Sequence, residues 1–344
     1  MAFYPLVRPF VFALEAERAH RLSLAGLGAL SATGDAETFD PVLRTRVANL
    51  DFANPIGLAA GYDKDATAPG QLLGLGFGFV EVGTLTPLPQ AGNPRPRLFR
   101  LVEDKAVINR MGFNNGGQQA ALKRLARPRR KGIVGVNIGA NKDASDRIAD
   151  YVTGVKAMAD VASYLTVNIS SPNTPGLRSL QDKGALDDLL ARVMEARGPL
   201  GPPVFLKVAP DLEPADIDDI AQVATSHHVD ALIVSNTTIS RPPLKSTHAG
   251  ESGGLSGAPL KSLAHQRLRD FRKATGGSIP LIGVGGIASA EDAYDRIRAG
   301  ASLIQLYSAL VYEGPGLARR IADGLKALLE RDGFANVAQA VGSE

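Results

Sequence analysis

The sequence predicts an α/β protein built as a closed (β/α)8 TIM barrel with a small N-terminal helical extension. From about residue 54 the chain repeats a short apolar run, a glycine or polar end, and then an amphipathic segment. The apolar residues of each run are continuous rather than alternating, as in strands buried on both faces of a parallel sheet. Eight such repeats favour a barrel over an open doubly wound sheet. The runs span residues 56–60, 79–83, 133–138, 164–169, 204–208, 231–235, 281–284 and 303–307.

The composition agrees with one large domain and narrows the chemistry. Of 344 residues, 44% are hydrophobic and 21% charged, and a single α/β barrel of about 250 residues would take up most of the chain. The chain contains no cysteine, which excludes disulfides, Cys-ligated zinc or iron–sulfur clusters and a thiolate nucleophile. Because 38 Lys and Arg nearly balance 35 Asp and Glu, composition gives little support to nucleic-acid binding.

The first 40 residues predict one or two short amphipathic helices. Apolar residues recur there at spacings of three and four, on one helix face. They are Phe3, Tyr4, Leu6, Val7, Phe10, Val11 and Leu14. The longest unbroken apolar run, 10–14, is far shorter than the roughly 20 residues of a membrane span, and the order of charges is not that of a signal peptide. Two interpretations stay open: a helix packed on the main domain, and a helix lying at a membrane surface. Residues 31–35 have the composition of a polar linker.

Helical patterns separate the predicted strands. Apolar residues occur at helical spacing over 148–155 and again over 186–193. A further helix is expected to start at Glu213-Pro214, because proline fits the first helical turn. A basic run over 123–131 is interpreted as a solvated helix end, with contact to anionic lipid as the alternative.

Polar residues gather at the carboxyl ends of the predicted strands, where such barrels assemble their active sites. They are mostly amides and hydroxyls, with two lysines, Lys64 and Lys207, and hardly a carboxylate. This set poorly suits a hydrolase with paired acids or a metal site, so no metal is expected. It suits a planar heterocycle, because each polar group of a buried ligand needs a partner. Four glycines near the last strands would let backbone N–H groups approach a phosphate. They are Gly257, Gly283, Gly285 and Gly286.

Four long motifs follow one another along the chain. They are 54–61 (NPIGLAAG), 109–115 (NRMGFNN), 168–176 (NISSPNTPG) and 282–287 (IGVGGI). Shorter motifs extend the set from Tyr4-Pro5 and 17–20 (ERAH) to 305–308 (QLYS). Together they resemble the quinone-dependent (class 2) dihydroorotate dehydrogenases, FMN enzymes of pyrimidine synthesis. The resemblance implies oxidation of (S)-dihydroorotate to orotate, with FMN as hydride acceptor and a membrane quinone as final electron acceptor.

The resemblance also implies where one FMN per chain would bind. Its contacts would be Ala60, Gly61, Lys64, Thr84, Asn137, Asn168, Lys207 and Ser235, with the phosphate at Gly257, Gly286, Tyr307 and Ser308. Lys207 would place an ammonium beside the flavin N1 region and stabilise the anionic reduced flavin. A lysine inside the apolar run 204–208 would be costly without an anionic partner.

The same resemblance implies a substrate site and a base. Substrate contacts would be Lys64, Asn109, Arg110, Met111, Gly112, Phe113, Asn168, Asn173, Asn236 and Thr237. Lys64 suits the substrate carboxylate, and the amides suit its urea-like edges. Ser171 corresponds to the family's base, which takes the C5 proton while a hydride leaves C6. The proton would then pass through Thr174 or an ordered water.

The N-terminal segment also gains a role from the resemblance. In this family it lies on the membrane and forms an apolar tunnel for ubiquinone or menaquinone, and His20 and Arg100 match positions that line the tunnel. We therefore expect residues 1–40 to serve membrane association and quinone access, and residues 41–344 to form the FMN-binding barrel. The expected location is the cytoplasmic side of the inner membrane, as a peripheral protein. The expected partners are substrate, quinone and a lipid surface, without nucleic acid, and the chain is expected to be a monomer.

Two alternatives stay open. One keeps the FMN barrel but acts on another uracil-like ring, as in flavin enzymes that reduce uracil in tRNA; those use a cysteine as acid, and this chain has none. The other is a non-catalytic membrane-associated barrel with a vestigial flavin, against which Ser171, Lys207 and the amides argue. The lack of cysteine also separates the chain from class 1 relatives, whose base is a cysteine.

Overall fold

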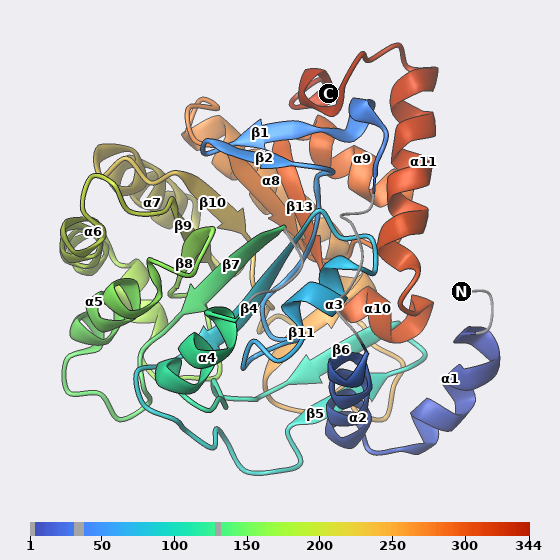
Figure 1. The fold of residues 1–344 in the computed structure, drawn as a ribbon, viewed down its shortest axis with the longest axis horizontal. Coiled ribbons are helices and arrows are strands. Elements are labelled where there is room, and N and C mark those ends of the chain that lie inside the picture. The colour runs from blue at the N-terminus through green and yellow to red at the C-terminus, as the bar shows by residue number, and fades with distance from the viewer. Residues whose placement is uncertain (1–3, 31–37, 128–131) are drawn as a thin grey trace.

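Eight parallel strands close into a barrel in the computed structural model, which describes residues 4–30, 38–127 and 132–344 (Figure 1). They are β3 (Ile56–Leu58), β4 (Phe79–Leu85), β7 (Ile133–Ile138), β8 (Tyr164–Asn168), β9 (Val204–Val208), β10 (Ala231–Val234), β12 (Leu281–Val284) and β13 (Ala301–Leu306). Neighbours in the barrel follow one another in chain order, so the predicted (β/α)8 barrel is confirmed. The strand ends differ from the predicted runs by up to two residues.

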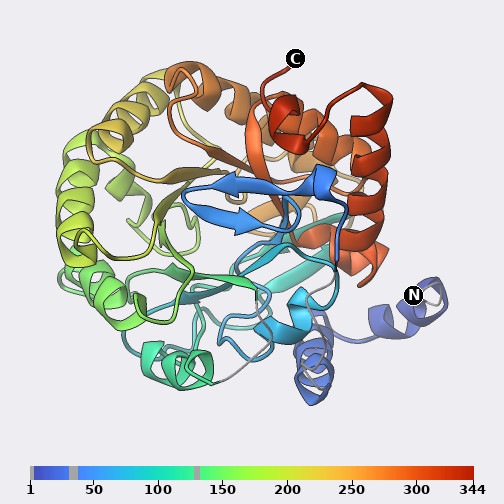
Figure 2. The same ribbon diagram turned by 45° about the horizontal axis from the view of Figure 1, so that its top comes forward.

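Helices surround the barrel, as Figure 2 shows. They are α3 (Pro69–Leu73), α4 (Gln118–Leu125), α5 (Arg147–Met158), α6 (Lys183–Arg197), α7 (Pro214–Ser226), α8 (Lys261–Ala274), α9 (Ala290–Arg298), α10 (Ser308–Glu313) and α11 (Leu317–Arg331). Short 3-10 turns are η1 (Pro41–Leu43), η2 (Arg178–Gln181), η3 (Ala258–Leu260) and η4 (Val337–Ala340). The three helices predicted from periodicity or capping are confirmed as α5, α6 and α7. Helix α7 begins at Pro214, where the Glu213 N–H donates to Asp216 Oδ2 at 2.9 Å. The basic run lies partly at the end of α4, and its residues 128–131 fall outside the described residues.

Two short helices precede the barrel, α1 (Tyr4–Ala13) and α2 (Ala16–Ala29). Figure 1 shows them at the margin of the molecule, with α2 beside β5 and α1 near α10. The Glu15 carboxylate caps α2 by accepting from the N–H groups of Glu17 and Arg18, both at 2.8 Å. In the part of the chain that the structure describes, no helix is long and apolar enough to span a bilayer. Phe3 and the predicted linker 31–35 lie outside that part.

A β-hairpin that the sequence analysis did not predict covers one end of the barrel (Figure 2). It joins β1 (Thr45–Val47) to β2 (Leu50–Phe52). The Phe52 ring meets Phe79 edge-on at 5.1 Å, and Phe79 is the first residue of β4. Tyr164 and Phe205, near the starts of β8 and β9, stack at 4.3 Å. Aromatic rings therefore fill the amino end of the barrel, and the carboxyl end is left for the site.

A three-stranded antiparallel sheet forms beside the carboxyl end, in the order β11-β6-β5. Its strands are β5 (Leu98–Leu101), β6 (Ala106–Asn109) and β11 (Gly254–Gly257). The glycine-containing segment 254–257, which was not among the predicted strands, is therefore a strand. No local pattern in the sequence indicates β11, because its partner strand β6 lies almost 150 residues away. Glycine is needed here, since a Cβ at Gly254 would lie 2.0 Å from Thr237 Oγ1.

Candidate active site

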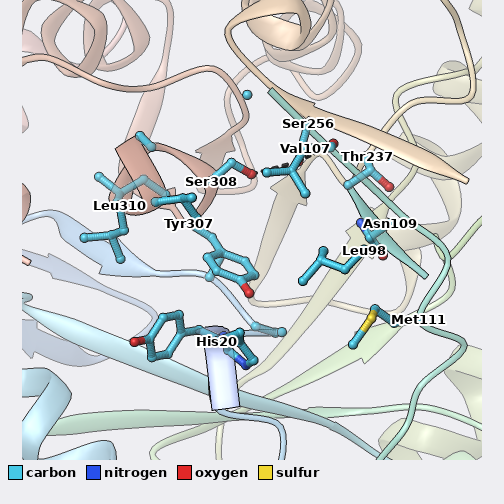
Figure 3. A pocket seen from close by; sticks show the side chains of 18 of the residues that line it. His20, Leu98, Val107, Asn109, Met111, Thr237, Ser256, Tyr307, Ser308 and Leu310 are labelled. Atoms are coloured by element: carbon cyan, nitrogen blue, oxygen red, sulfur yellow. Dashed lines mark hydrogen bonds between the residues drawn. The ribbon is translucent and has the colours of Figure 1, made fainter. Parts of the chain in front are cut away.

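A cavity of about 600 Å³ opens at the carboxyl ends of the strands and continues to the N-terminal helices. Strand ends and their loops, the β11-β6-β5 sheet, and helices α1 and α2 all contribute to its wall. Figure 3 shows His20 of α2 near Tyr307, with Leu98 and Met111 on another side of the cavity. Polar and apolar regions thus belong to one continuous space.

The cavity brings together nearly all the residues that the sequence analysis proposed, because the carboxyl ends of parallel strands share one edge of a barrel. The predicted residues in its wall are His20, Ala60, Gly61, Lys64, Thr84, Arg100, Asn109, Met111, Gly112, Phe113, Asn168, Ser171, Asn173, Lys207, Ser235, Asn236, Thr237, Gly257, Gly286, Tyr307 and Ser308. Gly285 also lines the cavity, whereas Asn137, Arg110, Gly283 and Thr174 are not among the lining residues.

Asn137 lies behind the residues that line the cavity and contacts two of them. Its side chain is fully buried. Its Oδ1 accepts hydrogen bonds from Thr84 Oγ1 at 2.6 Å and Asn168 Nδ2 at 3.1 Å. Both donors line the cavity, so Asn137 orients residues that a ligand would touch.

Lys207 on β9 is a buried cation at the cavity wall, only 4% exposed. Burial lowers the pKa of its ammonium, and the negative charge of Glu81 opposes that shift. Glu81 lies inside the barrel on β4 and accepts hydrogen bonds from Asn137 Nδ2 at 2.7 Å, Gln305 Nε2 at 2.8 Å and Tyr164 OH at 3.1 Å. The negative charge of this carboxylate offsets part of the cost of burying the lysine.

The loop after β8 carries Ser171, which is 5% exposed and lines the cavity. Its Oγ accepts a hydrogen bond from the backbone N–H of Asn173 at 3.2 Å. The Asn173 side chain in turn donates to Asn109 Oδ1 at 3.3 Å. Among the described residues, the buried Thr174 hydroxyl has no hydrogen-bond partner. The candidate base and two candidate substrate amides therefore belong to one cluster. Thr174, three residues after Ser171, has a hydroxyl that is free to accept or donate a hydrogen bond among the described residues.

Arg178 joins the loops after β8 and β10, a role that the sequence analysis missed. Its guanidinium donates to the carbonyls of Ser170 at 3.1 Å and Thr237 at 3.2 Å, and to Asp211 at 3.0 Å. Asn236 Nδ2 also donates to Ser170 Oγ at 2.9 Å. No local pattern marks Arg178, because its three partners come from different loops.

Lys64 reaches the cavity from the loop after β3. Its ammonium donates to the Gly61 carbonyl. Burial lowers the pKa of Lys64 to about 8, and the positive charge of Arg97 contributes in the same direction. Lys64 is therefore mainly protonated at pH 7, and an anionic ligand would stabilise its charge.

Another part of the cavity has a backbone that favours glycine. Gly257 and Gly286 have φ values of +96° and +71°. A Cβ at Gly286 would lie 2.4 Å from the Lys261 Cα. The hydroxyls of Ser256 and Ser308 meet beside them at 2.7 Å (Figure 3). Hydroxyls beside a backbone that only glycine adopts readily suit a phosphate group, because no side chain of that backbone stands in its way.

Aromatic and aliphatic side chains form the region next to α1 and α2. The centre of the His20 ring lies 5.0 Å from the centre of the Tyr62 ring and 6.3 Å from that of the Tyr307 ring. Burial lowers the pKa of His20 to about 3, so the imidazole is neutral at pH 7. Arg100 donates to carbonyls at the end of α1, including that of Val11 at 3.1 Å, and thereby ties α1 to β5.

Comparison with known proteins agrees with this geometry. The family model described as "Dihydroorotate dehydrogenase" matches residues 42–329. A protein of Novosphingobium aromaticivorans named "Dihydroorotate dehydrogenase (quinone)" is 64% identical over 350 residues, covering 100% of both chains. One of Erythrobacter litoralis with the same name is 64% identical over 342 residues, covering 99% of both. The chain belongs to the quinone-dependent dihydroorotate dehydrogenase family.

Solved structures of dihydroorotate dehydrogenases show the same fold. The ligand-free enzyme of Eimeria tenella matches with a TM-score of 0.91 and 42% identity, over 95% of this chain and 99% of that one. The complex of the Eimeria tenella enzyme with ferulenol matches with a TM-score of 0.90 and 42% identity, over 95% of both chains.

In this dihydroorotate dehydrogenase family member, the Arg110 side chain points away from the cavity. Its guanidinium binds Glu251 at 2.7 Å and lies 4.6 Å from the centre of the Phe99 ring. The structure therefore gives no support to a substrate contact through this side chain. The motif could not show this, because Glu251 lies 141 residues further along the chain.

Several lining residues escaped the sequence analysis. Tyr62, Leu98, Val107 and Leu310 contribute to the wall. Tyr62 directly follows Gly61, the last residue of the motif 54–61, and this position could have indicated that it lines the site. Leu98 and Val107 had none, because they lie on β5 and β6, strands that periodicity did not predict.

Proposed function

We propose that this chain oxidises (S)-dihydroorotate to orotate, with FMN as hydride acceptor and a membrane quinone as final electron acceptor, in pyrimidine synthesis. The observation that carries the proposal is the single cavity, which joins a glycine cradle and an amide cluster around Ser171 to an apolar region against α1 and α2. Membership of the quinone-dependent family supports the same activity. Such a cavity would hold a polar ring and an apolar quinone beside one cofactor.

One FMN per chain fits the residues present. Its phosphate would bind at Gly257, Gly286, Tyr307 and Ser308, and its ring system at Ala60, Gly61, Lys64, Thr84, Asn168 and Ser235. When bound, FMN supplies a two-electron acceptor at the barrel mouth. Lys207 holds a positive charge at the wall, which favours the gain of electrons by a cofactor beside it.

Dihydroorotate would bind at the amide cluster. The Lys64 ammonium pairs with its carboxylate, and the side chains of Asn109, Asn173, Asn236 and Thr237 meet the polar edges of its ring. Met111, Gly112 and Phe113 shape the wall beside them, and Asn168 contributes a further amide. Asn109, Asn173, Asn236 and Thr237 are half-buried, and their amide and hydroxyl groups favour a ring with several donors and acceptors.

Ser171 is the proposed catalytic base. Oxidation removes a proton from C5 and a hydride from C6 of the substrate, and the Ser171 hydroxyl takes the C5 proton. Because a hydroxyl is a weak base, the proton must pass on. The buried Thr174 hydroxyl, which lacks a partner among the described residues, or a water is the proposed acceptor.

Residues 1–40 are the proposed unit of membrane association and quinone access, and 41–344 the FMN-binding barrel. Ubiquinone or menaquinone would enter past His20 and Arg100, with α1 resting on the cytoplasmic side of the inner membrane as part of a peripheral monomer. Deleting residues 1–40 should abolish quinone reduction and its stimulation by detergent. Flavin reduction at saturating dihydroorotate should persist, because the buried core clusters lie beyond residue 40. Unchanged quinone turnover would refute this assignment.

An anaerobic absorbance spectrum of the purified chain tests the proposal. The flavin bands should bleach when dihydroorotate is added and return when a quinone is added. A protein without flavin bands, or with bands that dihydroorotate leaves unchanged, would show that the proposed function is wrong.

A further inference from the structure

Arg97, the residue before β5, holds α2 against the barrel through a buried ion pair. Its Nε and Nη2 donate to the two carboxylate oxygens of Glu17, at 3.0 and 2.9 Å. Both side chains are 5% exposed. Glu17 and Ala19 are the buried residues of α2, so this carboxylate is the principal buried anchor of the helix. The two-pronged geometry fixes orientation as well as distance.

The same guanidinium organises the loop after β4. Its Nη1 donates to the carbonyls of Ala91 at 2.6 Å and Asn93 at 2.8 Å. Gly92 between them has a φ of +76°. A Cβ there would lie 2.3 Å from the Met111 carbonyl oxygen and 2.9 Å from Arg97 Nη1. The loop is therefore closed tightly around Arg97, against the segment proposed to bind substrate.

Asn93 continues these contacts to the proposed base. Its Nδ2 donates to the carbonyls of Arg110 at 3.0 Å and Asn173 at 3.2 Å. The backbone N–H of Asn173 donates to Ser171 Oγ at 3.2 Å. The contacts Glu17–Arg97, Arg97–Asn93, Asn93–Asn173 and Asn173–Ser171 thus join α2 to the base.

We propose that Arg97 and Asn93 are positioning residues that couple the docking of α2 to the affinity for dihydroorotate. The inference rests on the proposed function, which places quinone access at α2 and dihydroorotate at the amide cluster. When Glu17 loses its charge, Arg97 is left as a buried cation without a full counterion, a state that proteins avoid by rearranging. Movement of Arg97 releases Asn93, and with it the carbonyls of Arg110 and Asn173. The position of α2, beside the apolar region of the cavity, therefore influences the affinity of the polar region for dihydroorotate.

The test measures flavin reduction by dihydroorotate without quinone, in FMN-loaded enzyme by anaerobic stopped flow. Glu17→Gln keeps the shape of the side chain and removes its charge. It should raise the half-saturating dihydroorotate concentration by about five- to tenfold, a typical coupling between sites, with the limiting rate changed less than about twofold. Arg97→Lys keeps the charge but cannot donate two parallel hydrogen bonds to Glu17, so it should also raise the half-saturating dihydroorotate concentration.

A double variant tests whether the contacts act in series. Asn93→Ala breaks the other end of the connection and should raise the half-saturating concentration similarly. The double variant Glu17→Gln/Asn93→Ala should have a half-saturating dihydroorotate concentration no higher than that of the weaker-binding single variant, because both substitutions interrupt the same series of contacts. If the two increases in half-saturating concentration multiply instead, the inference is overturned.

Arg95→Gln is the matched control. Arg95 also binds Glu17, at 3.0 Å, but its side chain is 58% exposed, so its loss should leave the half-saturating concentration within about twofold. Flavin content per chain and Tm establish that each variant is folded. If Glu17→Gln and Arg97→Lys slow quinone turnover but leave dihydroorotate binding unchanged, α2 acts on the quinone alone and the inference is overturned. If dihydroorotate fails to reduce the flavin of the unaltered chain, the proposed function falls and the inference falls with it.

Discussion

Ser171 is the side chain on which the proposed proton transfer depends. Ser171→Ala should slow flavin reduction by about 10²–10⁴-fold, the range for loss of a general base. FMN should stay bound, because the proposed cofactor contacts lie on other residues. Single-turnover stopped flow measures the rate, and flavin absorbance per chain measures retention. A nearly normal rate would remove Ser171 from the mechanism.

Lys64 makes substrate affinity depend on pH. With its pKa lowered to about 8, the ammonium is charged below that pH and becomes neutral as pH rises through it. Because the charged form pairs with the substrate carboxylate, affinity for orotate should fall above about pH 8, approaching tenfold per pH unit. Titration of the flavin spectrum with orotate between about pH 6 and 9 measures this.

Lys64→Met supplies the comparison for that titration. It should weaken orotate binding at pH 7 and remove the step near pH 8. His20 adds no step in this range, because its pKa of about 3 keeps it neutral. Equal affinity of the unaltered chain across the whole range would contradict the role of Lys64.

Helix α1 presents an apolar surface that the barrel does not cover. Leu6 and Phe10 are 69% and 76% exposed, and none of the described residues of α1 is buried. Since burying a Phe side chain contributes about 1.5–3 kcal/mol, Phe10→Glu should weaken binding to lipid vesicles by about tenfold or more. Co-sedimentation with vesicles of mixed zwitterionic and anionic phospholipid measures the change.

Leu200→Glu is the control for that experiment. Leu200 is 99% exposed and follows α6, which Figure 1 shows on the opposite side of the barrel from α1 and α2. Its substitution should leave vesicle binding unchanged, and Phe10→Glu should leave flavin reduction by dihydroorotate unchanged. Equal vesicle binding by all three proteins would count against α1 as the membrane contact.

Closure of the barrel places large rings against glycines on neighbouring strands. Gly135 on β7 faces Tyr164 on β8, and a Cβ at Gly135 would lie 2.1 Å from the ring. Gly135→Ala should therefore lower the free energy of unfolding by about 1–3 kcal/mol, the usual cost of overpacking. Denaturant unfolding measures this. Gly184→Ala on α6, where an added Cβ would meet no atom within 4 Å outside the adjoining turns of its own helix, should be neutral or slightly stabilising.

The barrel and most of its site could be predicted because their signals are local. A continuous apolar run marks a strand buried on both faces, wherever it lies in the chain. The polar ends of those runs then converge through topology alone, which is why Lys64, Asn168 and Lys207 line one cavity. The β11-β6-β5 sheet had no such signal, because its register joins Leu255 to Ile108.

The amino-acid sequence was sufficient for the order of the strands, the ring of polar residues and the family motifs. Folding in three dimensions settled which side chains face the cavity: Asn137 supports the wall from behind, and Arg110 turns outward to Glu251. It also brought Glu17 to Arg97, 80 residues away. Periodicity and propensity depend on near neighbours in the chain. The direction of a side chain and the charges it meets depend on residues that become neighbours only when the barrel closes.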